Sequence, residues 1–207
     1  MKHKIIAVFI LLALALAAVQ GQNRQSSNSN NILVVYFSRH GSSIGSNDTD
    51  AVSSASLSPG DAITVANIIK DASGADMFQI ITVDPYPRNY RETTDVARRE
   101  QRENARPALA SRIENLDSYN TIILGYPNWW GTLPMPVAHF LESHDFSGKT
   151  IVPYCVHEGS RMGSSEALIA QLAPGATVKE GLAIRGNSAG SSRRDVEQWL
   201  RKNGLIR

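Results

Sequence analysis

The chain alternates between short apolar runs and longer stretches in which apolar residues recur at helical spacing. Runs such as ILVVYF and TIILGY are apolar at nearly every position, which is typical of strands covered by helices on both faces. Strands are predicted at 32–37, 77–83, 121–126, 150–156 and 177–184. Helices are predicted between and after them, at 62–72, 90–103, 135–142, 164–172 and 193–202. This alternation predicts an α/β fold, a doubly wound five-stranded parallel sheet in a three-layer sandwich.

The first residues do not fit this pattern. Lys2 and Lys4 precede an uncharged apolar run over residues 5–19 that ends at polar Gln20, as in a secretory signal peptide. A membrane anchor is the alternative, but the run is shorter than the ~20 residues that a spanning helix needs, and no basic cluster follows it. We therefore expect residues 1–21 to be a signal peptide, and the protein to be exported to the periplasm or the extracellular space without a stable membrane anchor.

The next segment, residues 22–31, reads QNRQSSNSNN and offers no apolar side chain to bury. Such a composition predicts a disordered tether. The remaining residues, 32–207, are enough for one medium-sized domain with a single full core.

Charge and cysteine content narrow the function classes. Removal of the signal peptide takes away two lysines, so 21 − 2 = 19 basic residues face 19 acidic ones. A formally neutral protein without a Lys/Arg block argues against nucleic acid or an anionic membrane as the main partner. Cys155 is the only cysteine, which excludes an intrachain disulfide, and its apolar neighbours predict a buried, unreactive thiol.

Ligands of open parallel sheets bind beyond the carboxyl ends of the strands, where the strand order reverses. The first such loop begins with Ser38, Arg39, His40 and Gly41, and after a long insertion up to residue 60 the chain enters a helix. Hydroxyls, glycine and the free amides of a helix N-terminus suit a phosphate, although the same residues are also ordinary turn formers. An insertion this long is either functional or disordered, because ~2 to 6 residues are usual.

The loop after the third predicted strand holds two adjacent tryptophans. It contains, in order, Pro127, Asn128, Trp129, Trp130 and Gly131. Two neighbouring tryptophans cannot both face one core, so we expect one to stack on a planar ligand and the other to anchor the loop. The stacking role is assigned to Trp129, which lies nearer the strand end, and the anchoring role to Trp130.

The loop after the fourth predicted strand carries His157, Glu158, Gly159 and Gly163. Its glycines would let backbone amides approach the edge of a ligand. Ser160 beside His157 raises the alternative of a serine hydrolase, but the segment lacks the G-x-S-x-G spacing of a nucleophile elbow. We predict neither a covalent catalyst nor a metal ligand.

Several short sequence motifs of this chain occur together in one protein family. They are the strand and loop at 32–39, DPYP at 84–87, EQRENARP at 100–107, LGYPNWWGTLPMP at 124–136, FLESHDFSGKT at 140–150 and HEGS at 157–160. In order and spacing, from about residue 32 to 185, the chain resembles the bacterial flavodoxin-like family.

The resemblance implies the flavodoxin strand order 2-1-3-4-5, with flavin mononucleotide (FMN) at the switch between strands one and three. It implies that the loop starting at Ser38 holds the phosphate, while the loops at 127–131 and 157–163 flank the isoalloxazine ring. The chain departs from the family in the phosphate loop. Asp61 and Ala62 stand where the family has an asparagine and a threonine, which removes two polar groups and adds a negative charge. Arg39 and His40 could compensate, because an arginine fork binds phosphate oxygens.

The function implied is an FMN-binding flavoprotein that transfers electrons, either as a carrier or as a small quinone-type reductase, with an unknown redox donor and acceptor. FMN would supply the redox chemistry, and the protein would supply stacking and contacts to the ring edge. The alternative is a flavodoxin-fold binding protein that has lost stable FMN binding, as the changes at Asp61 and Ala62 would allow.

Overall fold

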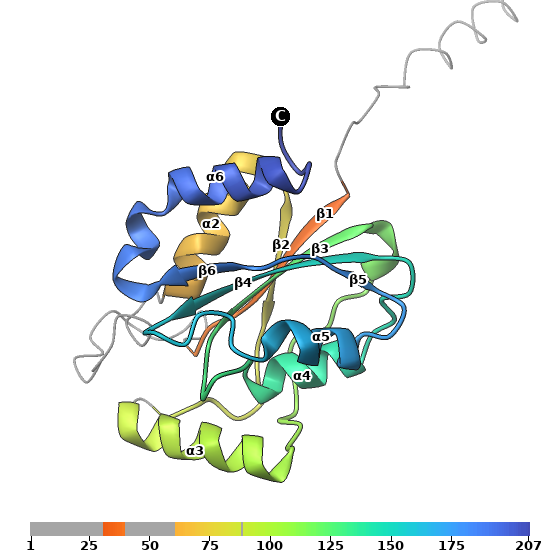
Figure 1. Ribbon diagram of the computed structural model, residues 1–207. Coiled ribbons are helices and arrows are strands. Elements are labelled where there is room, and N and C mark those ends of the chain that lie inside the picture. Colours follow the sequence, from red (N-terminus) through yellow and green to blue (C-terminus); the bar gives the residue numbers. More distant parts are fainter. Residues whose placement is uncertain (1–30, 40–60, 88) are drawn as a thin grey trace, which may run out of the picture.

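The computed structural model describes residues 31–39, 61–87 and 89–207 (Figure 1). The predicted signal peptide, the predicted tether up to residue 30, and the insertion, with His40 and Gly41, lie outside the described residues. These predictions are therefore not tested by the structure.

A parallel sheet with the order β2-β1-β3-β4-β5 forms the centre of the molecule, as predicted. A further strand, β6, pairs with β4 next to β5, and every pairing is parallel. The strands are β1 (Ile32–Phe37), β2 (Asp76–Ile80), β3 (Thr121–Pro127), β4 (Thr150–His157), β5 (Thr177–Val178) and β6 (Leu182–Arg185).

Two layers of helices cover the sheet (Figure 1). On one face lie α2 (Asp61–Ser73) and α6 (Arg193–Lys202), and on the other lie α4 (Met135–Glu142) and α5 (Ser165–Leu172). The side chains of β1 show why both layers form, because Val34 packs in the core under α2 and α6 while Val35 packs in the core under α4 and α5. The structure also contains two short 3-10 helices, η2 (Leu116–Ser118) and η3 (Gly186–Ser191).

The helix α3 (Tyr90–Glu103) belongs to neither layer. It stands beyond the carboxyl ends of the strands, separate from the two helical layers (Figure 1). Asn89 starts it by accepting a hydrogen bond from the Glu92 N–H, and Asn104 ends it in the left-handed conformation at φ 48°.

Two predicted strands differ from the structure. The second ends at Ile80 instead of residue 83, because the Ile81 N–H donates to Ser111 Oγ at 2.8 Å and the Val83 N–H to the Ala108 carbonyl at 2.8 Å. The chain there pairs with the segment that follows α3 instead of continuing in the sheet. Neither partner is close in sequence.

The fifth predicted strand is two strands, β5 and β6, separated by three residues. Within this break the Gly181 N–H donates to the Glu166 carboxylate on α5 at 2.6 Å instead of to a strand carbonyl. A Cβ at Gly181 would lie 2.4 Å from Met162 Cε and 3.1 Å from the Pro153 carbonyl oxygen, so the break passes closely over its neighbours. Both pieces still pair with β4, which preserves the predicted order.

Three further observations concern the described residues alone. None of the described helices combines the length and apolar character needed to cross a membrane. No group of His, Cys, Asp and Glu side chains able to hold a metal ion occurs within the described ranges. Cys155 is buried and forms no disulfide. Burial raises the pKa of its thiol to about 12, which makes it a weak nucleophile.

Candidate functional site

A cavity of about 430 Å³ opens at the carboxyl ends of β1, β3 and β4. Seven of the predicted site residues line it, namely Arg39, Asn128, Trp129, Trp130, Gly131, His157 and Glu158. Val156 and Ser160 contribute from the end of β4 and its loop. The volume lies within the ~300 to 1,000 Å³ typical of small-molecule sites.

The wall opposite the strand ends is α3, which the sequence analysis did not assign to the site. Tyr90, Thr93, Thr94 and Ala97 line the cavity. Their spacing of three, one and three residues places them on one face of the helix. The sequence signal for this wall was the stripe of small and aromatic residues in an otherwise highly charged segment.

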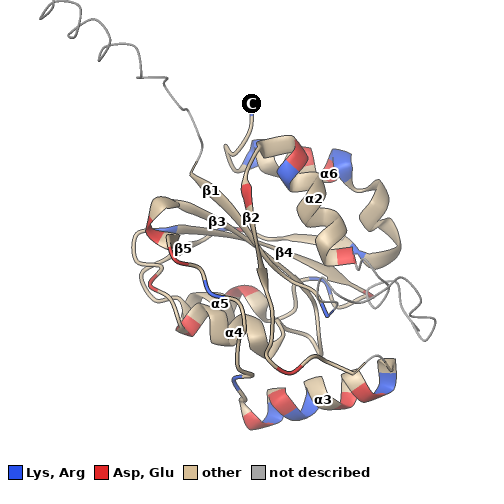
Figure 2. Ribbon diagram, turned by 180° about the vertical axis from the view of Figure 1, so that it is seen from behind, with Lys and Arg blue, Asp and Glu red and all other residues tan. Residues whose placement is uncertain are grey.

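The outer face of α3 carries charges of both signs. Its sequence YRETTDVARREQRE holds four basic and four acidic residues, and Figure 2 shows them spread along the helix. The helix is therefore formally neutral, and it presents no surface of a single charge at the site.

The loop after β3 forms a tight turn at the cavity. Trp129 and Thr132 exchange backbone hydrogen bonds of 2.9 and 3.2 Å, with Trp130 at φ 54° and Gly131 at φ 84° between them. Positive φ at both central positions is the signature of a type I′ turn. Glycine is suited to this conformation, whereas a bulky residue such as tryptophan rarely adopts it.

Trp130 is held in this unusual conformation by contacts to α3. Its indole Nε1–H donates to the Thr94 carbonyl at 3.0 Å, and Gln101 Nε2 donates to the Trp130 carbonyl at 3.4 Å. The Arg98 guanidinium carbon lies 4.7 Å from the centre of the ring, close enough for a cation–π contact. The side chain is nevertheless 48% exposed.

Trp129 lies deeper and packs against two aromatic rings. Its ring centre is 5.5 Å from that of Phe37 and 5.1 Å from that of Tyr86, both in edge-to-face arrangement. The burial differs from the expectation, because Trp129 makes the core contacts while Trp130, expected to be the buried anchor, is exposed and hydrogen-bonded to α3. Both tryptophans line the cavity, so the structure leaves the choice of stacking residue to experiment.

The loops after β3 and β4 are joined to one another. The Asn128 N–H donates to the Val156 carbonyl at 2.8 Å, and its Nδ2 donates to the Arg161 carbonyl at 2.8 Å. The Ser164 N–H donates to the Gly131 carbonyl at 2.9 Å. A Cβ at Gly163 would lie 2.0 Å from that same carbonyl oxygen, so only glycine permits this approach.

Arg39 is 8% exposed at the end of β1 and faces the start of α3. Its Nη1 donates to the Pro87 carbonyl at 3.0 Å and lies 3.4 Å from Thr93 Oγ1, which itself donates to Pro87 at 2.7 Å. Arg39 thus ties the first loop to the α3 wall. Whether it also contacts a phosphate, as the sequence suggests, remains a prediction.

The other predicted residues among those described do not line the cavity. Ser38 and Pro127 are buried at the ends of β1 and β3, and Gly159 lies in the loop after β4. Asp61 and Ala62 begin α2, whose first amides suit an anion. Ala62 is only 3% exposed, and its carbonyl accepts a 2.8 Å hydrogen bond from the Tyr154 hydroxyl, so its side chain belongs to the core.

His157 ends β4 with its side chain on the cavity. The Gly159 N–H donates to its Nδ1 at 2.9 Å. Burial lowers the pKa of the imidazole below its ordinary value, and the positive charges of Arg161 and Arg185 lower it further, against a weaker opposing effect of Glu158. His157 is therefore neutral at neutral pH.

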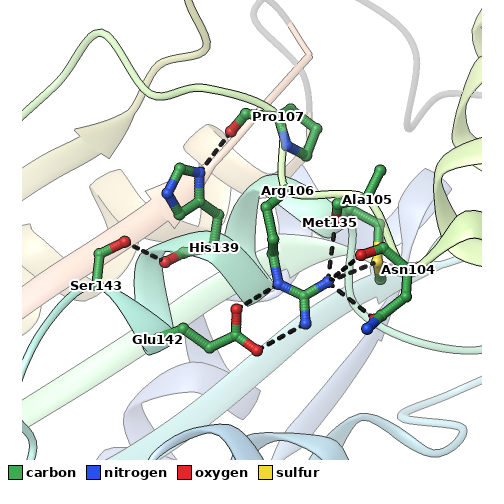
Figure 3. Close-up of polar contacts among 8 residues, drawn as sticks. All are labelled: Asn104, Ala105, Arg106, Pro107, Met135, His139, Glu142 and Ser143. Atoms are coloured by element: carbon green, nitrogen blue, oxygen red, sulfur yellow. Dashed lines mark hydrogen bonds and ion pairs between the residues drawn. The ribbon is translucent and has the colours of Figure 1, made fainter.

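A polar network holds the end of α3 against α4 (Figure 3). Arg106 binds the Glu142 carboxylate with two nitrogens, and its Nη1 donates to the Asn104 and Ala105 carbonyls at 2.9 and 3.0 Å. His139 Nδ1 lies 2.7 Å from the Pro107 carbonyl, and it must be the donor because a carbonyl only accepts. The network fixes the chain that leaves α3 and so supports the cavity wall.

A sequence model of the flavodoxin family matches residues 51–203. The chain belongs to the flavodoxin family. Family membership supports FMN as the cofactor. A search of curated proteins found no match.

Solved structures show the same fold. A candidate flavoprotein from Bacteroides eggerthii is 27% identical with a TM-score of 0.63, and the match covers 83% of this chain and 96% of that one. A candidate flavoprotein from Bacteroides uniformis is 25% identical with a TM-score of 0.61, over 82% of this chain and 97% of that one. A flavoprotein from Lactobacillus acidophilus in complex with FMN is 17% identical with a TM-score of 0.56, over 81% and 97%, and shows the fold alone.

The residues at the cavity fit a flavin. A planar ring needs an apolar slot with aromatic neighbours and a few polar groups at its edge. Here the two tryptophans and Ala97 supply apolar surface, while His157 and the backbone near Gly131 supply polar groups. The site thus has the parts that a bound isoalloxazine requires.

Proposed function

We propose that the protein binds FMN in the cavity at the ends of β1, β3 and β4 and uses it for electron transfer. The observation that carries the proposal is the joined pair of loops after β3 and β4, which brings the tryptophan turn and His157 to one cavity at the switch between β1 and β3. When bound, FMN would supply the hydride or one-electron chemistry.

The protein side of this function is binding and shielding. Trp129 and Trp130 offer ring surfaces, Arg39 holds the first loop to α3, and the amides at the start of α2 favour a phosphate. The wall formed by α3 encloses the cavity on the side away from the strands. We infer that the partner is a small-molecule acceptor of the quinone type, because a carrier would expose the ring edge to another protein.

The N-terminal sequence adds a location to this proposal. The apolar run after Lys2 and Lys4 supports export, so we propose a periplasmic or extracellular flavoprotein. Fractionation of cells that express the full chain, with detection of the cleaved form outside the cytoplasm, tests it. Uncleaved protein retained in the cytoplasm would contradict export.

The decisive experiment is the visible absorption spectrum of the purified protein, followed by calorimetric titration of the flavin-free form with FMN and with riboflavin. We expect a yellow protein that binds FMN more tightly than riboflavin, because the N-terminus of α2 and the first loop can bind the phosphate, which riboflavin lacks. Equal affinities would show that no phosphate site exists. Failure to bind either flavin would favour the alternative of a flavodoxin-fold protein that has lost its cofactor.

A further inference from the structure

The geometry around His157 fixes which of its two ring nitrogens carries the proton. The Gly159 N–H can only donate, and it points at Nδ1 from 2.9 Å. Nδ1 must therefore accept and be unprotonated. A neutral imidazole has one N–H, so in His157 this N–H is at Nε2.

The surroundings keep the ring in this neutral form. His157 is 9% exposed, and protonation at Nδ1 would set an N–H against the Gly159 N–H and lose the hydrogen bond. Arg161 in the same loop and Arg185 at the end of the neighbouring β6 add positive charge, and exposed Glu158 offsets them in part. From the opposite walls, Arg39 is the further charged residue on the cavity, and α3 presents uncharged Tyr90 and threonines.

The remaining Nε2–H belongs to a side chain that lines the cavity. Among the described residues, His157 has a hydrogen-bond partner at Nδ1 but no protein acceptor at Nε2. Nε2 is not one of the fully buried, unpartnered side-chain atoms of the described residues, so its N–H is open to the cavity, where a ligand can accept its hydrogen bond.

We propose that His157 acts as a neutral hydrogen-bond donor, through Nε2–H, to an acceptor atom at the edge of the bound flavin ring. The inference rests on the proposed function and gives His157 a positioning and tuning role in it. A ring edge gains negative charge on reduction, so a donor at this place binds the reduced cofactor more tightly than the oxidised one. The nearby arginines add to that preference without charging the imidazole.

The first test needs no flavin. Nitrogen NMR of the wild-type flavin-free protein, labelled at histidine, should show the Nε2–H tautomer for His157 and a titration below the ordinary histidine value of about 6.5. An Nδ1–H tautomer, or a titration at or above the ordinary value, overturns the proposal whatever the protein binds.

The second test compares His157→Phe, which removes the donor, with His157→Gln, which retains an N–H donor. Loss of one neutral hydrogen bond should weaken oxidised FMN about 2- to 12-fold in the Phe variant, and Gln should recover part of the loss. The reduction potential of the Phe variant should be more negative, by about 30 mV for each tenfold preference lost. His144→Gln, on a histidine bonded to the Phe140 carbonyl away from the cavity, is the matched control and should match the wild type.

The outcomes separate the two proposals. Wild-type FMN affinity and potential in His157→Phe would overturn the donor role and leave the proposed function standing. Absence of FMN binding by the wild-type protein would overturn both. Should the Phe variant not fold, the potential of His157→Gln and the NMR of the wild type still decide the donor role.

Discussion

Trp130 combines an exposed ring with a backbone conformation that tryptophan avoids. We expect Trp130→Gly to lower flavin affinity while leaving the stability of the flavin-free fold unchanged or higher, because glycine relieves a left-handed strain of about 1 to 2 kcal/mol. Trp130→Ala should lower affinity equally but keep the strain. Thermal melts and FMN titrations of both variants check this. Full affinity in both variants would remove Trp130 from the binding site.

Trp129 should respond differently, because its ring packs against Phe37 and Tyr86. Trp129→Ala should destabilise the flavin-free protein by about 2 to 3 kcal/mol, below the ~3 to 5 kcal/mol for a fully buried tryptophan since the residue is only partly buried. Denaturant unfolding of the flavin-free variant measures the cost. A loss of flavin affinity without loss of stability would instead support the stacking role assigned to Trp129 from the sequence.

The sequence located the tryptophan pair but inverted the order of burial. Two adjacent aromatic residues in a loop indicate one buried and one exposed side chain. Which one is buried depends on Phe37 and Tyr86, which are far away in sequence, and on the positive φ of Trp130. Neither is visible in the order of residues. The same holds for Arg39, because its hydrogen bond to the Pro87 carbonyl depends on the path of the chain between β2 and α3.

At the scale of elements, the Arg106–Glu142 pair ties the end of α3 to α4 (Figure 3). We expect Arg106→Lys, which keeps the charge but loses the two-nitrogen contact, to speed hydrogen exchange in α3 while costing at most about 1 kcal/mol of global stability. Exchange mass spectrometry over residues 90–103 measures it. Arg193→Lys is the matched control, because Arg193 pairs with exposed Asp71 away from α3. Equal exchange in both variants would contradict a supporting role.

The same pair predicts a pH dependence. Hydrogen bonding from Arg106 lowers the pKa of Glu142, more than partial burial raises it. A carboxylate with a lowered folded pKa stabilises the protein fully above its unfolded pKa of about 4.3, and this contribution is lost as the pH falls through the folded value. We therefore expect α3 exchange, corrected for intrinsic rates, to speed up in acid. Glu142→Gln should show fast exchange at neutral pH and no acid step, and an unchanged step in this variant would assign it to another group.

Most elements follow from the sequence, and the exceptions have long-range causes. The bounds of α3, α4 and α6 agree with the prediction, since their apolar spacing and end residues are local signals. The break between β5 and β6 depends on the Glu166 carboxylate, and the early end of β2 depends on Ser111. The role of α3 as a cavity wall was missed for the same reason, because a helix pattern gives the buried stripe but not the element it faces.

For the whole molecule, the sequence predicts that residues 22–30 add nothing to stability. Their composition offers no apolar group, while Ile32, at the start of β1, is buried. A protein that begins at Asn31 should melt at the same temperature as one that begins at Gln22. Calorimetry of the two forms checks this, and a clear drop in the shorter form would show that the segment packs on the domain.

Binding at this cavity should stabilise the entire fold, because its walls come from the ends of β1, β3 and β4 and from α3. A ligand that binds only the folded state adds about 2.7 kcal/mol at a concentration one hundred times its Kd. For a chain of this size, that corresponds to a rise in Tm of about 5 to 10 °C.

We expect FMN to produce this shift, riboflavin to produce a smaller one at the same concentration, and inorganic phosphate alone to produce little. The comparison separates the contribution of the ring to binding from that of the phosphate. Equal Tm shifts by FMN and riboflavin would mean that α2 and Arg39 do not bind the phosphate. A shift by FMN that survives Trp130→Gly, His157→Phe and Trp129→Ala alike would place the ring outside the cavity described by these residues.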